Sequence, residues 1–361
     1  MIVGGGPAGS LSAIKLRNYD VLLVEEHQSP GFPVQCAGLV SEDCYRVLKR
    51  YSKCRIKYVR GAYLFSPSGK NLEIEGRSRG VLIDRKILDR DLLIKASEIA
   101  DVWIKTKFVG VKDEHVAVLL RHGERVYREF EYLIGADGVY SRVARSFGFE
   151  RPNVLSALQM ECRFKPLSDD MVEIYFGKRF SNGFFAYSIP VDDFARVGVI
   201  TRENPYFYLK NTIKFLSDRV SSSFVELNSG AIPIGLVDFV KENVILIGDS
   251  AGMTKPYTGG GLFYIIKAVE KLKFFPDLKR IRREYLRDLG REYRIGMKIF
   301  KLYSILDDRD YDYLIEVARE ILHLIRDLHM DRPSTLIPLI PRLIKLIKRP
   351  GILKKMISLV F

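Results

Sequence analysis

Between Ile247 and Leu262 the chain reads I-G-D-S-A-G-M-T-K-P-Y-T-G-G-G-L, and no other segment carries as much structural information. Asp249 follows an apolar, strand-like run, where its carboxylate can accept a hydrogen bond from a cofactor hydroxyl. The glycines at 259–261 open an apolar, helix-like segment, whose free N–H groups suit a phosphate or an electron-rich ring edge. The residues that we expect to contact this ligand are Asp249, Gly260, Gly261 and Leu262.

A second turn of this kind lies at the start of the chain, where Val3–Gly9 reads V-G-G-G-P-A-G. In a G-x-G-x-x-G turn the glycines permit a tight bend, close approach of a pyrophosphate and close packing of helix on strand. Glu25 directly follows an apolar run and suits ribose hydroxyls. Only Met1–Val3 precede the turn, so either the first strand is short or the true start lies upstream.

Two nucleotide-type turns in one chain favour a flavin dinucleotide, FAD. Its ADP half would contact the N-terminal turn, and its ribityl chain and ring would contact the second turn. The residues predicted for the ADP half are Gly4, Gly6, Ala8, Gly9 and Glu25.

Size and charge restrict the classes of function. With 361 residues, of which 47% are hydrophobic, the chain is long enough for two domains. Its formal net charge of +14 favours an anionic partner, such as nucleic acid, an acidic membrane surface or a phosphorylated substrate. We expect no nucleic-acid partner, because no stacking platform or recognition motif accompanies the charge. Nothing in the pattern indicates an oligomeric state.

Cysteine and histidine usage argues against a disulfide framework and against a metal site. The four cysteines form no CxxC pair and the five histidines are scattered, so we expect reduced thiols and no metal. We find no secretory leader and no uncharged apolar run of about 18 residues. The sequence therefore predicts a cytoplasmic protein, either soluble or peripheral on the inner face of the membrane.

The order of the patterns predicts an α/β fold. Strand, glycine turn, helix and strand open the chain, whereas alternating strands run from Pro152 to Ile234. We expect a Rossmann-like FAD-binding domain, an inserted antiparallel-sheet substrate domain and a helical, basic C-terminal region. The predicted boundaries are 1–57, 78–150 and 236–285 for the first, 58–77 and 151–235 for the second, and 286–361 for the third.

Several local signals place single elements. Apolar periodicity predicts helices over Pro7–Leu16 and Asp84–Ala100, and Ser41 is predicted to cap a further helix. The pair His122-Gly123 predicts a hairpin turn.

The tail from Thr335 to Phe361 carries six basic residues and no acid. Its apolar residues recur at helical spacing, which predicts a basic amphipathic helix; they are Leu339, Ile340, Leu343, Ile344 and Ile347. Such a helix can lie in a lipid headgroup layer. The alternative is a helix that packs on the protein and exposes its basic face.

Three motifs in this order resemble those of the flavin hydroxylase superfold: the N-terminal glycine turn, G-A-D-G-V-Y-S-R-V at Gly135–Val143, and the turn at Gly248–Gly261. Within that class the chain resembles the geranylgeranyl reductase family of archaeal and photosynthetic organisms. The segments that carry the closer likeness are P-V-Q-C-A-G at Pro33–Gly38, G-A-I-P-I-G at Gly230–Gly235 and G-M-T-K-P-Y-T-G-G-G at Gly252–Gly261. The likeness covers roughly residues 1–300.

One motif departs from the family pattern. The family's Y-x-W-x-F-P followed by G-x-G corresponds here to F-A-Y-S-I-P at Phe185–Pro190 and then G-V-I at Gly198–Ile200. Tyr187 replaces tryptophan and Ile200 replaces glycine, which leaves the shape of the substrate tunnel open. The predicted substrate-binding residues are Phe185, Tyr187 and Pro190, and core packing is the alternative for the two aromatic side chains.

The resemblance implies further contacts with FAD. Cys36, Ala37 and Leu39 would lie in a loop near the isoalloxazine ring, and Arg90 would contact the flavin. Phe108 would contact the adenine through its backbone. Asp137 and Gly138 form an Asp-Gly pair that completes the predicted site.

Cys36 is the catalytic candidate. A thiol above the flavin can donate a proton or shape the approach of an alkene, because reduction of C=C adds a hydride and a proton from different groups. The alternative is a small apolar residue in a ligand-binding loop.

The family likeness implies an FAD-dependent reductase that saturates C=C bonds of geranylgeranyl or other isoprenoid chains, on archaeal-type membrane lipid precursors. Its electrons would come from transiently bound NAD(P)H or from a ferredoxin-type donor, because no second complete dinucleotide fold is evident. The alternatives are an FAD-dependent monooxygenase of aromatic or quinone substrates, and a membrane-associated flavoprotein without turnover.

Overall fold

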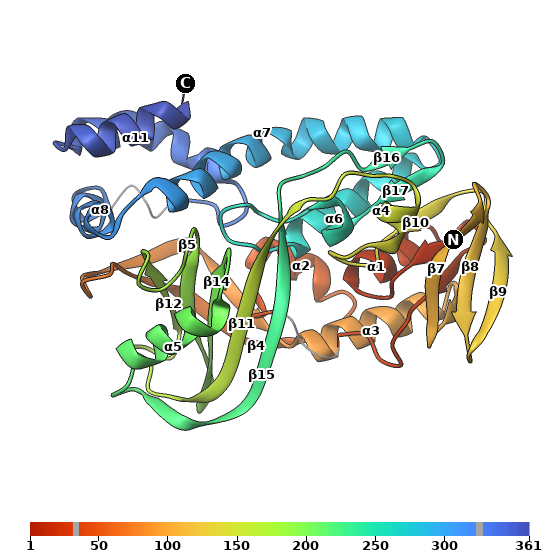
Figure 1. Ribbon diagram of the computed structural model, residues 1–361, viewed down its shortest axis with the longest axis horizontal. Coiled ribbons are helices and arrows are strands. Elements are labelled where there is room, and N and C mark those ends of the chain that lie inside the picture. The colour runs from red at the N-terminus through yellow and green to blue at the C-terminus, as the bar shows by residue number, and fades with distance from the viewer. Residues whose placement is uncertain (32–35, 323–327, 361) are drawn as a thin grey trace.

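The computed structural model describes residues 1–31, 36–322 and 328–360 (Figure 1). Within them, one sheet of six strands has the order β16-β17-β10-β1-β2-β6, and its neighbours pair in parallel except β16 with β17. The strands are β1 (Ile2–Val3), β2 (Leu22–Val24), β6 (Asp101–Trp103), β10 (Leu133–Gly135), β16 (Val240–Lys241) and β17 (Val244–Leu246). In a doubly wound sheet of this kind ligands bind at the carboxyl ends of the strands.

Helices and a small meander surround this sheet. Helix α1 (Pro7–Lys15) packs against α3 (Arg85–Ser97) and α6 (Leu262–Lys271). A second layer is a meander that touches β2 and the short helix α4 (Arg142–Ser146). Its strands are β7 (Thr106–Asp113), β8 (Val116–Arg121) and β9 (Glu124–Glu129).

The second sheet has eight strands in the order β15-β11-β14-β13-β12-β4-β5-β3, and β12 with β4 is its parallel pair. Its strands are β3 (Leu39–Ser41), β4 (Arg55–Phe65), β5 (Asn71–Ile83), β11 (Asn153–Phe164), β12 (Met171–Phe176), β13 (Phe185–Val191), β14 (Phe194–Thr201) and β15 (Val220–Ile234). The hairpin at 55–83 is longer than the predicted segment 58–77, because β5 continues through fully buried residues to pair with β3.

The two faces of this sheet have different neighbours. Helix α5 (Pro205–Phe215) packs on the face that carries Met160, Ala186 and Val199. Figure 1 shows the sheet beside the nucleotide-binding half, with the long strands β11 and β15 leading from one to the other. Since side chains alternate along a strand, odd-numbered residues of β13 point away from α5.

Helix α7 (Leu278–Ile305) ties the two halves together. Its Tyr285, Leu289 and Tyr293 belong to the core of the nucleotide-binding half, whereas Phe300 packs with the second sheet. Figure 1 shows α7 running across the top of both sheets. The domain boundaries themselves stay a prediction.

The tail is not one continuous helix. After α8 (Asp308–Glu320) come the 3-10 segment η3 (Pro333–Leu339), α10 (Ile340–Leu346) and α11 (Pro350–Val360), and Ile347 has extended dihedrals. Proline disfavours helical backbone in the residue before it and donates no N–H, so the tail breaks ahead of Pro350. Ile347 and Ile352 pack on Val317 of α8. Among the described helices, none is long and apolar enough to span a membrane.

The strong local signals of the sequence are confirmed. Helix α1 begins at Pro7, and the Ser41 hydroxyl accepts a bond of 3.1 Å from Cys44 N at the start of α2 (Glu42–Leu48). His122 and Gly123 both have positive φ in the turn between β8 and β9, which is the geometry of a tight hairpin.

Candidate functional site

Two glycines of the N-terminal turn are required by close backbone packing. Gly4 has a φ of +102°, and a side chain there would collide with the Ala136 carbonyl. A Cβ on Gly9 would collide with the carbonyl oxygen of Gly4. These glycines therefore let α1 start directly against β1, as the G-x-G-x-x-G pattern predicts.

Gly6 has a different environment. A Cβ built on it meets no protein atom within 4 Å, and no side chain caps the helix that it begins. Space is therefore open beside Gly6, at the positive end of the helix, which fits a pyrophosphate.

Glu25 lies beside this turn at the end of β2. Its Oε2 accepts a hydrogen bond of 2.6 Å from Gly5 N, and its Oε1 accepts one of 2.8 Å from His27 N. Thr106 N also donates to the Glu25 carbonyl at 2.8 Å, so strand β7 and its Phe108 stand next to the predicted ribose position. The contacts of Glu25 and Phe108 with FAD stay predictions.

The two glycine turns, far apart in sequence, meet in space. A Cβ on Gly248 would lie 2.9 Å from Cβ of Ala8 in α1, and α6 packs along α1. Helix α6 begins at Gly261 without a side-chain cap, so a second uncapped helix start lies beside the first half of the site. This juxtaposition is what one extended dinucleotide needs.

Asp249 completes the second turn. Its Oδ1 would lie 3.5 Å from a Cβ on Gly261. Burial raises the pKa of the Asp249 carboxyl, and the Arg85 guanidinium opposes that rise, which places Arg85 within electrostatic range. Arg85 is a residue that the sequence analysis did not select. Its position right after the helix cap Asp84, at the end of a buried strand, is the signal that could have found it.

The loop that carries Cys36 is fixed from two sides. Arg196 donates to the Ala37 carbonyl at 2.9 Å, and Ile83 N donates to the Gly38 carbonyl at 2.9 Å. Cys36 is partly exposed, and its Sγ accepts a hydrogen bond of 3.4 Å from Gly38 N. The preceding residues of the predicted loop motif, Pro33, Val34 and Gln35, lie outside the described residues.

Tyr187 faces this loop from the second sheet. Its hydroxyl donates to Gln159 Oε1 at 2.9 Å. Burial raises the pKa of that hydroxyl, and the neighbouring Cys36 adds to the rise, which places the thiol and the phenol close together. Phe185 points to the same face of β13 and is buried.

Pro190, which is predicted to bind substrate, lies on the opposite face of the sheet from Tyr187, and its contact with substrate stays a prediction. Pro190 is paired with Ala195, which belongs to the core under α5, on the opposite side of the sheet from Tyr187. Residues at odd and even positions of a strand point to opposite faces, so Pro190 does not share a face with Phe185 and Tyr187.

Two other predicted residues have structural partners. The Asp137 carboxylate accepts bonds from Ser141 Oγ at 2.6 Å and from Arg142 N at 2.7 Å, so it caps α4. The Gly138 beside it has a positive φ and open space at its Cβ position. The side chain of Arg90 is 59% exposed and pairs with Asp91. Contacts of all three with FAD stay predictions.

An apolar cluster adjoins the site. Ala37 of the loop and Leu39 of β3 pack there with Phe184, which precedes β13, and with side chains from β13, β14 and α7, namely Phe185, Ile189, Ile200 and Phe300. A Cβ on Gly259 would lie 3.2 Å from Ile232 and 3.8 Å from Ile200, so the second glycine turn borders the same cluster.

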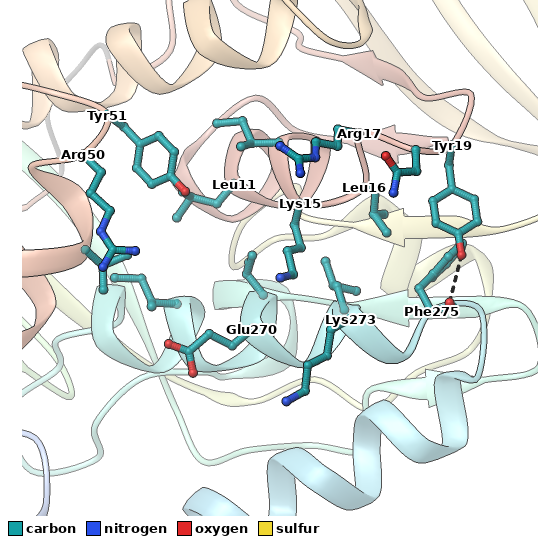
Figure 2. Close-up of a pocket in the computed structure, with 16 residues that line it drawn as sticks. Leu11, Lys15, Leu16, Arg17, Tyr19, Arg50, Tyr51, Glu270, Lys273 and Phe275 are labelled. Carbon is teal, nitrogen blue, oxygen red and sulfur yellow. Dashed lines mark hydrogen bonds between the residues drawn. The ribbon is translucent and has the colours of Figure 1, made fainter.

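A pocket of about 620 Å³ lies elsewhere, between the C-terminal ends of α1 and α6 and the end of α2. Figure 2 shows Lys15, Arg50 and Lys273 around it, together with apolar side chains such as Leu11 and Leu16. A cation near the C-terminus of a helix interacts favourably with the helix dipole, so the positions of these three basic residues need no ligand to explain them.

Comparison with known proteins gives the following relatives. The digeranylgeranylglycerophospholipid reductase of Methanococcus vannielii is 30% identical over 286 residues, which cover 73% of this chain and 72% of the relative. The reductase of the same name from Methanothrix thermoacetophila is 30% identical over 291 residues, 74% of each chain. An uncharacterised protein of Methanocaldococcus jannaschii is 31% identical over 88% of this chain and 87% of its own. No family model matches the chain.

Solved structures share the fold. A geranylgeranyl bacteriochlorophyll reductase-like protein from Thermoplasma acidophilum has a TM-score of 0.78 and 22% identity, over 96% of this chain and 98% of its own. The flavin-dependent halogenase CmlS has a TM-score of 0.65 and 17% identity, over 95% of this chain and 76% of its own. These likenesses confirm the predicted α/β fold.

Proposed function

The chain belongs to the digeranylgeranylglycerophospholipid reductase family, and on that premise we propose that it saturates C=C bonds of geranylgeranyl chains on archaeal-type membrane lipid precursors. The membership confirms the resemblance stated from the motifs and the class of enzyme, a flavin-dependent oxidoreductase. The observation that carries the substrate proposal is the apolar cluster that holds Tyr187 together with Ala37, the residue after Cys36, and that borders the second glycine turn at Gly259.

The residues present fit FAD. The uncapped start of α1 at Gly6 would hold the pyrophosphate, and Asp249 with Gly261 would hold the ribityl chain and the pyrimidine edge. When bound, FAD supplies the hydride that adds to the double bond.

The chain's own residues would supply the proton and the orientation. Cys36 carries a thiol proton in a partly exposed loop, whereas the Tyr187 proton is already donated to Gln159. We therefore assign proton donation to Cys36, with Arg196 holding its loop in place. The apolar cluster around Ile200 and Phe185 would bind the prenyl chain and exclude water.

The headgroup end of the substrate suits the basic character of the chain. We propose that Arg342, Lys345 and Lys348, all exposed on the tail, contact an anionic membrane surface on which the lipid resides. We also propose that NAD(P)H or a ferredoxin-type protein reduces the flavin transiently.

Mass spectrometry of the lipid tests the proposal. FAD-loaded protein, reduced with dithionite and incubated without oxygen with a digeranylgeranyl phospholipid, is expected to add two hydrogen atoms for each double bond reduced. Cys36→Ala is expected to keep FAD yet lose most of this activity, and Cys44→Ala is the matched thiol control. Unchanged turnover in Cys36→Ala would show that the thiol is not the proton donor and that Cys36 only packs in the loop. Oxygen consumption coupled to an aromatic or quinone substrate would instead support the monooxygenase alternative.

A further inference from the structure

A short C-terminal segment, His329–Thr335, lies against α7 and is called the strap below. Arg332 N donates to the His329 carbonyl at 3.2 Å, which closes its turn. Ser334 Oγ donates to Glu292 Oε1 at 2.7 Å, and Arg332 pairs with Asp288 at 3.2 Å. Both acids are on α7, so these hydrogen bonds and the ion pair fix the strap to that helix.

The strap reaches from α7 to the second glycine turn. Lys255 Nζ donates to Asp331 Oδ1 at 2.7 Å, with side chains that are 5% and 1% exposed. The Tyr257 hydroxyl donates to the Met330 carbonyl at 3.0 Å. The C-terminal region and the predicted flavin turn are therefore joined through a buried ion pair.

Lys255 also closes the turn with its backbone. Lys255 N donates to the Gly260 carbonyl at 2.9 Å, and Gly259 N donates to the Lys255 carbonyl at 2.8 Å. A Cβ on Gly260 would lie 2.9 Å from Lys255 Cε and 3.3 Å from its Nζ. The ammonium group is thus directly behind the backbone that begins α6.

Stability alone accounts poorly for this pair. The desolvation free energy of two buried charges is about as large as the Coulombic attraction between them. Replacement by an apolar pair of similar volume often makes the folded state equally or more stable. In addition, Asp331 Oδ2 is buried without a hydrogen-bond partner among the described residues. A buried orphan oxygen calls for an explanation other than packing.

We propose that Lys255 and Asp331 are positioning residues, which hold Gly259–Gly261 for the pyrimidine edge of the flavin and balance the charge behind it. The inference rests on the FAD binding of the proposed function but not on its substrate. Protein charge near the flavin ring tunes its electronics, so a change in this pair alters the affinity for FAD and its reduction potential.

The test uses full-length, FAD-loaded protein and needs no substrate. In Asp331→Asn the uncompensated Lys255 charge favours the more negative reduced flavin, so the midpoint potential is expected to shift upward. FAD binding is expected to weaken about tenfold, because the turn loses a charged hydrogen bond. Lys255→Met is expected to shift the potential downward, and the double variant to return it close to wild type.

Glu173→Gln is the matched control. Glu173 is 1% exposed and pairs with Arg219, on the α5 side of the second sheet. Its loss is expected to lower the unfolding temperature and leave FAD affinity and potential unchanged. The proposal is overturned if Asp331→Asn and Lys255→Met keep wild-type affinity and potential, or if Glu173→Gln shifts both equally. If the variants shift the flavin midpoint potential and FAD affinity as expected, but the wild-type protein does not reduce the lipid, only the proposed substrate is contradicted.

Discussion

Gly6 and Gly9 lie three residues apart but are glycine for different reasons. A Cβ on Gly9 would collide with the Gly4 carbonyl, whereas a Cβ on Gly6 would meet no protein atom within 4 Å. Gly6→Val is therefore expected to leave the unfolding temperature of FAD-free protein unchanged and to abolish the yellow colour. Gly9→Val is expected to destabilise even the FAD-free protein, by about 1–3 kcal/mol or more. Thermal unfolding and flavin absorbance check both; a Gly6→Val protein that retains FAD would contradict the pyrophosphate assignment.

The cysteines differ in exposure. Burial raises the pKa of the Cys162 thiol to about 11 and also raises those of Cys44 and Cys54. Because the thiolate is the nucleophile, iodoacetamide at a pH of about 8 is expected to label Cys36 first. Labelling of Cys162 is expected to rise only as the pH approaches 11. Bound FAD is expected to slow the reaction of Cys36. Peptide mass spectrometry measures the labelling rates. Equal rates at Cys36 and Cys162 would contradict the partly exposed position of Cys36 and the burial of Cys162.

The sequence predicts the role of a residue well where that role depends on the backbone geometry of its near neighbours in the chain. The glycines and the Ser41 cap follow from backbone geometry within a few residues. Arg85 was missed because its electrostatic effect on Asp249 depends on how α3 and the second glycine turn pack. The motif that selects Phe185, Tyr187 and Pro190 does not consider strand alternation, which puts Pro190 on the other face of the sheet.

At the scale of elements, periodicity predicts long helices well and broken ones poorly. The core positions of α3, Leu88, Leu92 and Ala96, are fully buried as their spacing predicts. The tail keeps helical spacing of apolar residues, yet Pro350 interrupts it and Ile347 packs on α8. The proposed membrane role of the tail therefore depends on its exposed basic residues more than on a continuous apolar face.

The exposed tail residues give a prediction for vesicle binding. Replacing Arg342, Lys345 and Lys348 by Gln is expected to weaken binding to anionic vesicles at low salt, by about 1 kcal/mol per residue. The unfolding temperature is expected to stay unchanged, since these side chains are exposed. A matched triple variant removes the same charge from the second domain, at Lys165, Lys210 and Lys214. Equal vesicle binding by wild type and both variants would remove the membrane role.

At the scale of the whole molecule, the site is the junction of segments that the chain order separates. The motif order predicted the nucleotide-binding and sheet halves, but not that α7 bridges their cores or that the strap returns to the flavin turn. Those contacts come from packing of the C-terminal region, for which the sequence shows only apolar periodicity and charge.

The central claim is that FAD held at this junction passes its electrons to a prenyl double bond. The direct measurement is the absorbance of bound flavin, first reduced with one equivalent of dithionite and then mixed without oxygen with a digeranylgeranyl phospholipid. We predict that the oxidised spectrum returns in proportion to the double bonds saturated. A flavin that stays reduced with the lipid, and reoxidises only when oxygen is admitted, would contradict the account.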